Sequence, residues 1–204
     1  MNALVIVDIQ NDFTDGGALA VPDGGSIISV VNGLEERFDI VVATQDWHPA
    51  GHKSFASSHS GRRSFDRISL NGLDQVLWPD HCIQGSLGAQ FHPGLHTNRI
   101  EAVFRKGMNP DIDSYSGFYD NGHRKNTGLA GYLRDRNVTT VYVCGLAADY
   151  CVYFTAKDAL KEGFDTYIIE DATRPIDKVG FESAKQDIIR SGGKIVLSPE
   201  ILDF

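Results

Sequence analysis

The amino-acid sequence predicts a three-layer α/β/α sandwich around a mostly parallel central sheet of about six strands. Two observations predict this fold. Short, continuously apolar runs, typical of strands buried on both faces, alternate along the chain with segments of helical periodicity. The length of 204 residues also suits a single α/β domain with a buried core. Right-handed crossovers then place helices on both faces of the sheet, and we expect one domain over residues 1–204.

The first half of the chain begins with a strand and a helix. Residues 3–8 (ALVIVD) are an apolar run that ends in an acid, as in a central strand. Asp23 is predicted to cap a helix that extends to about Phe38 and carries one apolar stripe. Residues 40–44 and 102–104 are predicted as the second and third strands. The residues of the stripe are Ile27, Val30, Val31, Leu34 and Phe38.

The second half repeats the alternation. Thr127 is a plausible N-cap for a helix that ends at Arg136. Residues 139–143 alternate β-branched and aromatic side chains, which indicates a buried strand that Gly145 should break. The remaining elements are predicted as a helix over 148–160, a strand over 164–170, a helix over 181–190 and a last strand over 194–197.

Two long segments do not fit regular structure. Residues 45–99 are rich in Gly, Ser, Pro and His and have weak apolar periodicity, and residues 106–126 are similar. Long loops inside a compact domain are usually functional or disordered. The first segment holds too many aromatic residues for disorder, so we expect both loops to be ordered and to form a site. These aromatic residues are Trp47, Phe55, Phe65, Trp78 and Phe91.

The overall composition excludes several classes of function. The net charge of −8 argues against binding to a phosphate backbone, and no apolar run is long enough to span a bilayer. Three cysteines form no disulfide framework and fit a reducing compartment. The chain enters a strand directly after Met1, without the basic region of a signal peptide. We therefore expect a cytoplasmic protein that binds neither nucleic acid nor membrane. The sequence leaves its oligomeric state open.

Cys151 is the residue with the clearest chemical potential. It lies where a predicted strand is followed by a helix, in the first turn of that helix. Unpaired N–H groups and the positive end of the helix dipole favour a thiolate there, so this thiol could ionise near neutral pH and act as a nucleophile. The alternative is a small, buried and inert cysteine, which is the commoner case.

Asp8 and Lys106 strengthen the interpretation of Cys151 as a nucleophile. Each follows a predicted strand, and the carboxyl ends of parallel strands meet at one edge of a sheet, where ligands bind. A thiol needs a base to take its proton and a cation to stabilise the anion. Taken singly, the aspartate could cap a loop and the lysine could be solvated. Together the three residues predict a catalytic group.

A second cluster consists of Asp46, His48, His52 and His81. A carboxylate with imidazoles is a ligand set for Zn²⁺, Mn²⁺ or Fe²⁺. In an extended segment Asp46 and His48 point the same way and can reach one ion. Histidines in a polar loop can also be plain surface residues. That interpretation applies to the other four, which are His59, His92, His96 and His123.

The chain resembles the nicotinamidases (pyrazinamidases) of the isochorismatase-like cysteine hydrolase superfamily along essentially its whole length. The segments VDIQNDF and GLAADYCV are typical of the superfamily. The histidine-bearing segments and the SYSGF loop are specific to the nicotinamidases. The matching segments are VDIQNDF (7–13), GGAL (16–19), TQDWHP (44–49), HKSF (52–55), WPDHCIQGS (78–86), KGMNPDIDSYSGF (106–118) and GLAADYCV (145–152).

The resemblance implies a role for each of these residues. It implies that Asp8, Lys106 and Cys151 form a catalytic triad. Asp46, His48 and His81 would bind a divalent metal ion, zinc in the first place and iron or manganese as alternatives, with His52 as a candidate fourth ligand. The family's cis peptide before Ala147 would turn the Ala147 N–H toward the site, where it forms an oxyanion hole with the Cys151 N–H. The walls around the substrate ring would be formed by Phe13, Trp78 and Tyr115.

The activity implied by the resemblance is hydrolysis of nicotinamide, and of pyrazinamide, through a Cys151 thioester. The metal would orient the substrate, and the product nicotinate would be recycled toward NAD. Two alternatives remain at this point. One is another amidohydrolase of the superfamily, such as an N-carbamoyl amide hydrolase, or an isochorismatase, although isochorismatases lack the cysteine. The other is a non-enzymatic sensor that uses the metal and the thiol.

Overall fold

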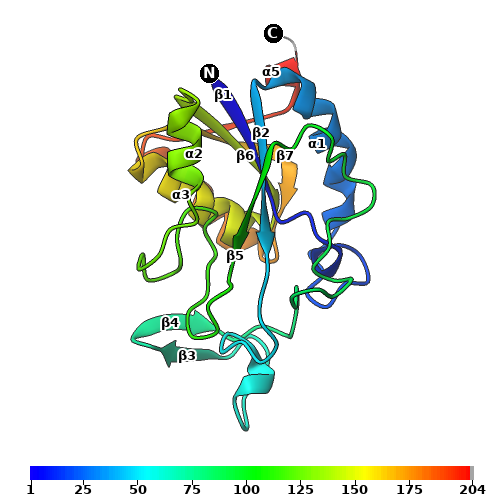
Figure 1. The fold of residues 1–204 in the computed structure, drawn as a ribbon, viewed down its shortest axis with the longest axis vertical. Helices are drawn as coiled ribbons and strands as arrows, with labels where there is room; N and C mark the ends of the chain where they lie inside the picture. The colour runs from blue at the N-terminus through cyan, green and yellow to red at the C-terminus, as the bar shows by residue number, and fades with distance from the viewer. Residues whose placement is uncertain (203–204) are drawn as a thin grey trace.

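The structure, a computed structural model, describes residues 1–202 and confirms the predicted three-layer sandwich (Figure 1). Six strands form the central sheet in the order β5-β2-β1-β6-β7-β8, and each strand pairs parallel to its neighbour. Their bounds are β1 Asn2–Val7, β2 Ile40–Asp46, β5 Ala102–Lys106, β6 Thr140–Leu146, β7 Asp165–Arg174 and β8 Lys194–Val196. The helices are α1 Ile28–Leu34, α2 Leu129–Asp135, α3 Tyr153–Lys161, α4 Lys178–Arg190 and α5 Pro199–Leu202.

The central strands contribute to hydrophobic cores on both faces of the sheet. In β1, Leu4 and Ile6 face the layer that contains α1, whereas Val5 and Val7 face the layer that contains α2, α3 and α4. Successive side chains of a strand point to opposite faces, so a strand covered on both sides must be apolar throughout. This is why the run at residues 3–7 is continuously hydrophobic. Among the described helices, none has both the length and the apolar character needed to cross a bilayer.

The first helix differs from the prediction at its start. Asp23 adopts a left-handed conformation (φ 56°) and its side chain caps nothing; a 3₁₀ turn over Gly24–Ile27 follows, and α1 begins only at Ile28. Two consecutive glycines form α-helix poorly, which favours the tighter turn. The predicted apolar stripe is largely correct, because Ile27, Val31, Leu34 and Phe38 are buried while Val30 is half-buried.

The N-cap of the second helix lies one residue later than predicted. Gly128 is the N-cap residue of α2, in a left-handed conformation (φ 92°). The Thr127 hydroxyl still accepts a hydrogen bond from the Leu129 N–H (3.2 Å) and donates one to the Gly117 carbonyl (2.6 Å). Thr127 therefore satisfies an N-terminal donor of the helix from one position further out than expected.

The prediction that Gly145 breaks its strand is wrong. Strand β6 continues to Leu146, and its pairing with β7 shifts register between Val143 and Gly145. Gly145 has φ 111°, and a Cβ at this position would lie 2.0 Å from the Val7 carbonyl oxygen. Only glycine permits this approach of β1 to β6. It brings the end of β6, with the cis peptide bond Leu146–Ala147, beside Asp8.

We expect Gly145→Ala to destabilise the protein by about 2 to 4 kcal/mol, because it combines a strained backbone with a steric overlap in the sheet. The free energy of unfolding from guanidinium titration measures this. Gly163→Ala is the matched control. Gly163 also has a positive φ (87°) but faces open space, so only backbone strain of about 1 kcal/mol remains. Equal losses in the two variants would contradict the close-approach argument.

A two-stranded antiparallel hairpin, which the sequence analysis did not predict, lies within the segment 45–99. Strands β3 (Arg67–Leu70) and β4 (Leu73–Val76) are joined by Asn71 and Gly72, both with positive φ. An Asn-Gly pair between two short strands is the signal of a type I′ turn, so the sequence did contain this information. The hairpin lies beyond the carboxyl ends of the central strands (Figure 1) and leads directly into Trp78.

Candidate active site

The structure brings Asp8, Lys106 and Cys151 together at the carboxyl edge of the sheet. Asp8 follows β1, Lys106 ends β5, and Cys151 lies in a single π-helical turn, Ala148–Val152, between β6 and α3. Lys106 Nζ is 2.8 Å from Asp8 Oδ2 and 3.4 Å from Cys151 Sγ. Thr44 donates a hydrogen bond to Asp8 Oδ1 (2.6 Å). All three predicted residues are buried. The Lys106 ammonium lies between the carboxylates of Asp8 and Asp46.

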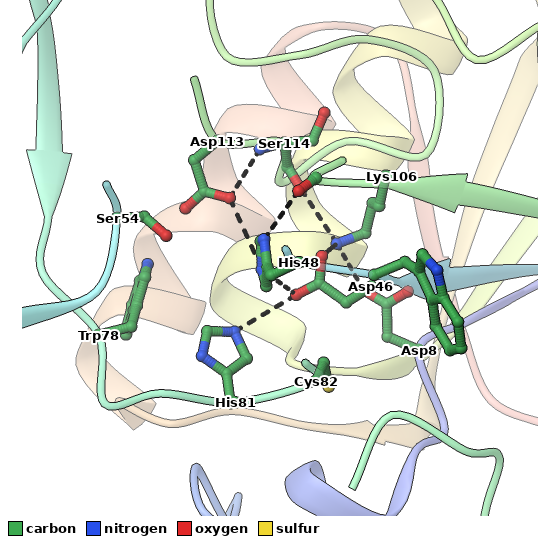
Figure 2. Close-up of polar contacts among 12 residues, drawn as sticks. Asp8, Asp46, His48, Ser54, Trp78, His81, Cys82, Lys106, Asp113 and Ser114 are labelled. Carbon is green, nitrogen blue, oxygen red and sulfur yellow. Dashed lines mark hydrogen bonds and ion pairs between the residues drawn. The ribbon is translucent and has the colours of Figure 1, made fainter. Parts of the chain in front are cut away.

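Lys106 connects the two predicted clusters. Besides Asp8, its Nζ lies 3.0 Å from Asp46 Oδ1 and 3.0 Å from the Ser114 carbonyl (Figure 2). Burial disfavours its charge, but the carboxylates of Asp46 and Asp8 outweigh burial and raise the pKa of Lys106 well above its usual value. The side chain is therefore a fixed cation shared by both clusters.

The protonation state of Cys151 differs from the sequence-based expectation. Burial raises the pKa of the Cys151 thiol well above its usual value; Lys106 partly offsets this, and the Asp8 carboxylate adds to it. The N-terminal turn therefore does not produce a free thiolate near neutral pH. Burial also raises the pKa of Asp8, so Asp8 is a stronger base than an exposed aspartate. Ionisation of the thiol must involve transfer of its proton to a neighbouring group.

Asp46, His48 and His81 converge on one point. Their candidate ligand atoms all lie within 4.8 Å of one another. Asp46 Oδ2 is 3.1 Å from His48 Nε2 and 3.4 Å from His81 Nε2 (Figure 2). Each histidine has its other nitrogen, Nδ1, next to a backbone carbonyl: Gly107 at 3.0 Å from His48, and Pro79 at 2.8 Å from His81.

These carbonyls determine which ring nitrogens are protonated. A carbonyl can only accept, so Nδ1 of each ring carries the hydrogen and donates it. The lone pairs on both Nε2 atoms then face the same oxygen of Asp46. Only a cation, either a proton or a metal ion, makes this arrangement favourable. The donor set thus fits a metal ion held by Asp46, His48 and His81.

The buried charges support the same conclusion. Asp8, Asp46 and Asp113 are buried acids, and Lys106 is the buried cation among them. With neutral histidines, three carboxylates against one ammonium leave a net charge of about −2. Unbalanced buried charge is costly. A divalent cation would balance it.

His52 lies beside this cluster but outside the first ligand group. Its Nε2 is 2.7 Å from the Asn109 carbonyl and its Nδ1 is 2.7 Å from the Ser54 hydroxyl. Both ring nitrogens therefore have partners. His52 belongs instead to a second group with His48 and Asp113, whose ligand atoms also lie within 4.8 Å of one another.

Two residues of the site were missed by the sequence analysis. Asp113, from the DIDSY segment, is buried with Oδ1 4.0 Å from His48 Nε2. The Gln10 side chain pairs with the backbone of Asp46: its Oε1 accepts from the Asp46 N–H and its Nε2 donates to the Asp46 carbonyl, both at 2.8 Å. The acid in a site-forming loop was a usable signal for Asp113. Nothing local to the sequence pairs Gln10 with Asp46.

A pocket connects the two clusters. The predicted wall residues Phe13, Trp78 and Tyr115 line it, together with Ala147 and Cys151 at one side and Asp46 and His81 at another. Trp78 Nε1 donates a hydrogen bond to the Tyr115 hydroxyl (3.3 Å). Asp113 also lines it, and the sequence analysis missed three further lining residues, which are Leu19, Tyr150 and Ile176. Tyr150 packs edge-on against Trp78 with ring centroids 4.8 Å apart.

Comparison with known proteins gives a consistent family. Residues 2–199 match the isochorismatase domain model. The chain is 47% identical to the nicotinamidase of Acinetobacter baylyi over 98% of this chain and 94% of that relative. It is 52% identical to the nicotinamidase of Escherichia coli, over 86% and 84% of the two chains.

Solved structures agree. A nicotinamidase–pyrazinamidase of Acinetobacter baumanii is 48% identical and superposes with a TM-score of 0.96, over 98% of this chain and 97% of that chain. A protein of L. infantum in complex with nicotinate is 40% identical with a TM-score of 0.86, over 98% and 93%. The pyrazinamidase of Pyrococcus horikoshii in complex with zinc is 38% identical with a TM-score of 0.79, over 96% and 98%.

Proposed function

This chain belongs to the isochorismatase family, and from its nicotinamidase relatives and the geometry of its pocket we infer that it hydrolyses nicotinamide to nicotinate and ammonia. The observation that carries this function is one pocket with two ends. One end is lined by the Cys151 thiol, which contacts Lys106 and through it Asp8 outside the lining. The other end is lined by Asp46 and His81, which contact each other and His48. Aromatic walls between them suit a flat pyridine ring.

We propose that Cys151 is the nucleophile and Asp8 its base. The raised pKa of both groups favours concerted chemistry: as Sγ attacks the amide carbon, Asp8 takes the thiol proton. The C–S bond forms as the carbonyl electrons move onto oxygen. The N–H groups of Ala147 and Cys151 are proposed to hold this oxyanion, each worth about 3 kcal/mol in the transition state.

The tetrahedral intermediate then collapses. The C–N bond breaks, Asp8 gives its proton to the departing nitrogen, and ammonia leaves behind a nicotinoyl thioester on Cys151. In the second half, Asp8 takes a proton from a water molecule that attacks the thioester carbon. The C–S bond breaks, Asp8 passes its proton to the departing sulfur so that the thiol is restored, and nicotinic acid leaves and ionises to nicotinate. Lys106 remains protonated throughout and holds Asp8 in place.

We propose that Asp46, His48 and His81 hold the metal ion, with zinc as the first candidate and iron or manganese as alternatives. Zinc is the ion in the structure of the Pyrococcus horikoshii relative. When bound, the ion would supply a positive charge that orients the substrate by attracting the nitrogen of its pyridine ring, directly or through a water molecule. We leave His52 out of the ligand set because its Nε2 donates to the Asn109 carbonyl and its Nδ1 accepts from the Ser54 N–H, so neither nitrogen offers a free lone pair to the ion.

Ammonia release from nicotinamide, measured with and without a chelator, tests the function. We expect turnover by the zinc-loaded protein and a large loss after chelation, restored by added metal. Pyrazinamide should also be hydrolysed. Hydrolysis of an N-carbamoyl amide in place of nicotinamide would contradict the proposal, and so would metal binding and thiol oxidation without any amide hydrolysis.

We further propose that the enzyme acts in the cytoplasm, in nicotinamide recycling. Its three free cysteines fit a reducing compartment of this kind.

We expect His48→Ala to lose the metal ion and to raise KM for nicotinamide by about 10-fold or more, because one of three ligands is removed. Metal content by mass spectrometry and steady-state kinetics measure the two effects. His92→Ala, a half-buried histidine outside the candidate ligand groups of the described chain, should change neither. Loss of metal with unchanged kinetics would contradict the orienting role.

A further inference from the structure

A buried glutamine on the hairpin contacts two residues of the pocket at once. Gln75 lies on β4 and is only 2% exposed. Its amide Nε2 is 3.0 Å from Asp113 Oδ2, 3.0 Å from the Tyr115 hydroxyl and 2.7 Å from the Val76 carbonyl. Carboxylate and carbonyl oxygens only accept, so the atom that faces them is the nitrogen, which donates. The amide has two hydrogens for these three acceptors, so one hydrogen is shared between two oxygens. Gln75 itself does not line the pocket.

The first contact fixes the Asp113 carboxylate. Its Oδ1 accepts a hydrogen bond from the Ser114 N–H (2.8 Å), and its Oδ2 accepts from Gln75. With both oxygens held, the plane of the carboxylate is set, and Oδ1 faces His48 (Figure 2). A hydrogen bond to a charged acceptor of this kind is stronger than one between neutral groups.

The second contact fixes the Tyr115 ring. Its hydroxyl oxygen accepts from Gln75 and also from Trp78 Nε1 at 3.3 Å. The two aromatic rings stand edge to face, with centroids 6.1 Å apart. Tyr115 belongs to the loop 106–126, whereas Gln75 and Trp78 belong to the hairpin and its exit. Gln75 thus joins the two long segments that build the pocket.

We propose that Gln75 is a positioning residue for nicotinamide hydrolysis, which acts by holding the Asp113 carboxylate and the Tyr115 ring in the geometry that receives the substrate. This role rests on the proposed function, since it concerns the pocket in which that reaction occurs. It also gives the hairpin a role in the reaction, because β4 supplies the donor that holds Tyr115 of the loop 106–126 against Trp78.

Gln75→Met tests the proposal, because methionine is similar in shape but donates no hydrogen bond. We expect KM for nicotinamide to rise about 10-fold or more and the affinity for nicotinate, measured by calorimetry, to fall by a similar factor. A merely structural role would lower the melting temperature and the active fraction, but it would leave KM and nicotinate affinity of the folded protein unchanged. Gln84→Met is the matched control, since Gln84 donates to the Trp47 carbonyl on the exposed surface.

A double-mutant cycle with Tyr115→Phe makes the test specific. Phenylalanine removes the hydroxyl, so Gln75→Met should cost clearly less in the Tyr115→Phe background than in the wild type. Equal costs in the two backgrounds, or unchanged KM and nicotinate affinity in Gln75→Met, would overturn the positioning role. A wild type that binds nicotinate but releases no ammonia would contradict the proposed function alone. A wild type that does neither would overturn both.

Discussion

Replacement of Cys151 by alanine should abolish ammonia release from nicotinamide, with a fall in kcat of about 10⁴-fold or more. The thiol is the atom that forms the covalent bond in the proposed mechanism, and neither Asp8 nor Lys106 can replace it. Cys151 is not in the candidate ligand groups, so metal content should stay near that of the wild type. Steady-state kinetics and metal analysis of the same preparation measure both effects.

Cys144→Ala is the matched control for this experiment. Cys144 is also buried, but it lies in the core on β6, and its sulfur is 3.9 Å from the Val5 carbonyl. Its replacement should reduce stability slightly and leave turnover intact. Acid quenching of the wild type during turnover should also trap a nicotinoyl adduct on Cys151. Ammonia release by Cys151→Ala within 10-fold of the wild type would rule out the thioester route.

Lys106→Met should remove activity and also destabilise the fold by about 3 to 5 kcal/mol. The ammonium lies between the buried carboxylates of Asp8 and Asp46, at 2.8 Å and 3.0 Å. A methionine of similar length leaves both carboxylates without their shared cation. Loss of one partner of a buried ion pair costs this much because an uncompensated charge remains. Guanidinium unfolding of the zinc-saturated protein measures the change.

Lys53→Met provides the comparison, because Lys53 forms an exposed pair with Asp111 at 2.5 Å. Side chains that are about half exposed are well screened, so this change should cost at most about 1 kcal/mol. Similar losses in the two variants would mean that the buried network contributes no more than a surface pair. Normal turnover in Lys106→Met would remove Lys106 from the mechanism.

Much of the fold could be predicted because each strand signal is local. The apolar run before Asp8 and the β-branched run before Gly145 reflect burial on both faces, which the periodicity of a sequence records directly. The errors concern backbone geometry. Gly145 was expected to end a strand, but the structure uses it for the close approach of Val7. A glycine in the sequence indicates an unusual backbone conformation, but it does not distinguish a strand end from a close approach of two strands.

The same division applies to the site. The sequence by itself indicated that Asp8, Lys106 and Cys151 meet at one sheet edge, because parallel strands share the direction in which they end. It could not reveal that the Lys106 ammonium also bonds Asp46, or that Gln75 bonds Asp113, because these contacts join side chains from segments far apart in the chain.

Only the tertiary structure decided the protonation state of the Cys151 thiol. The helix terminus visible in the sequence favours a thiolate, whereas burial beside Asp8 favours the thiol and raises the pKa of Cys151. The position of a side chain relative to its own strand or helix is a local property that the amino-acid pattern carries. Desolvation and the balance of buried charges depend on every segment packed around the site, and they exist only once the chain has folded.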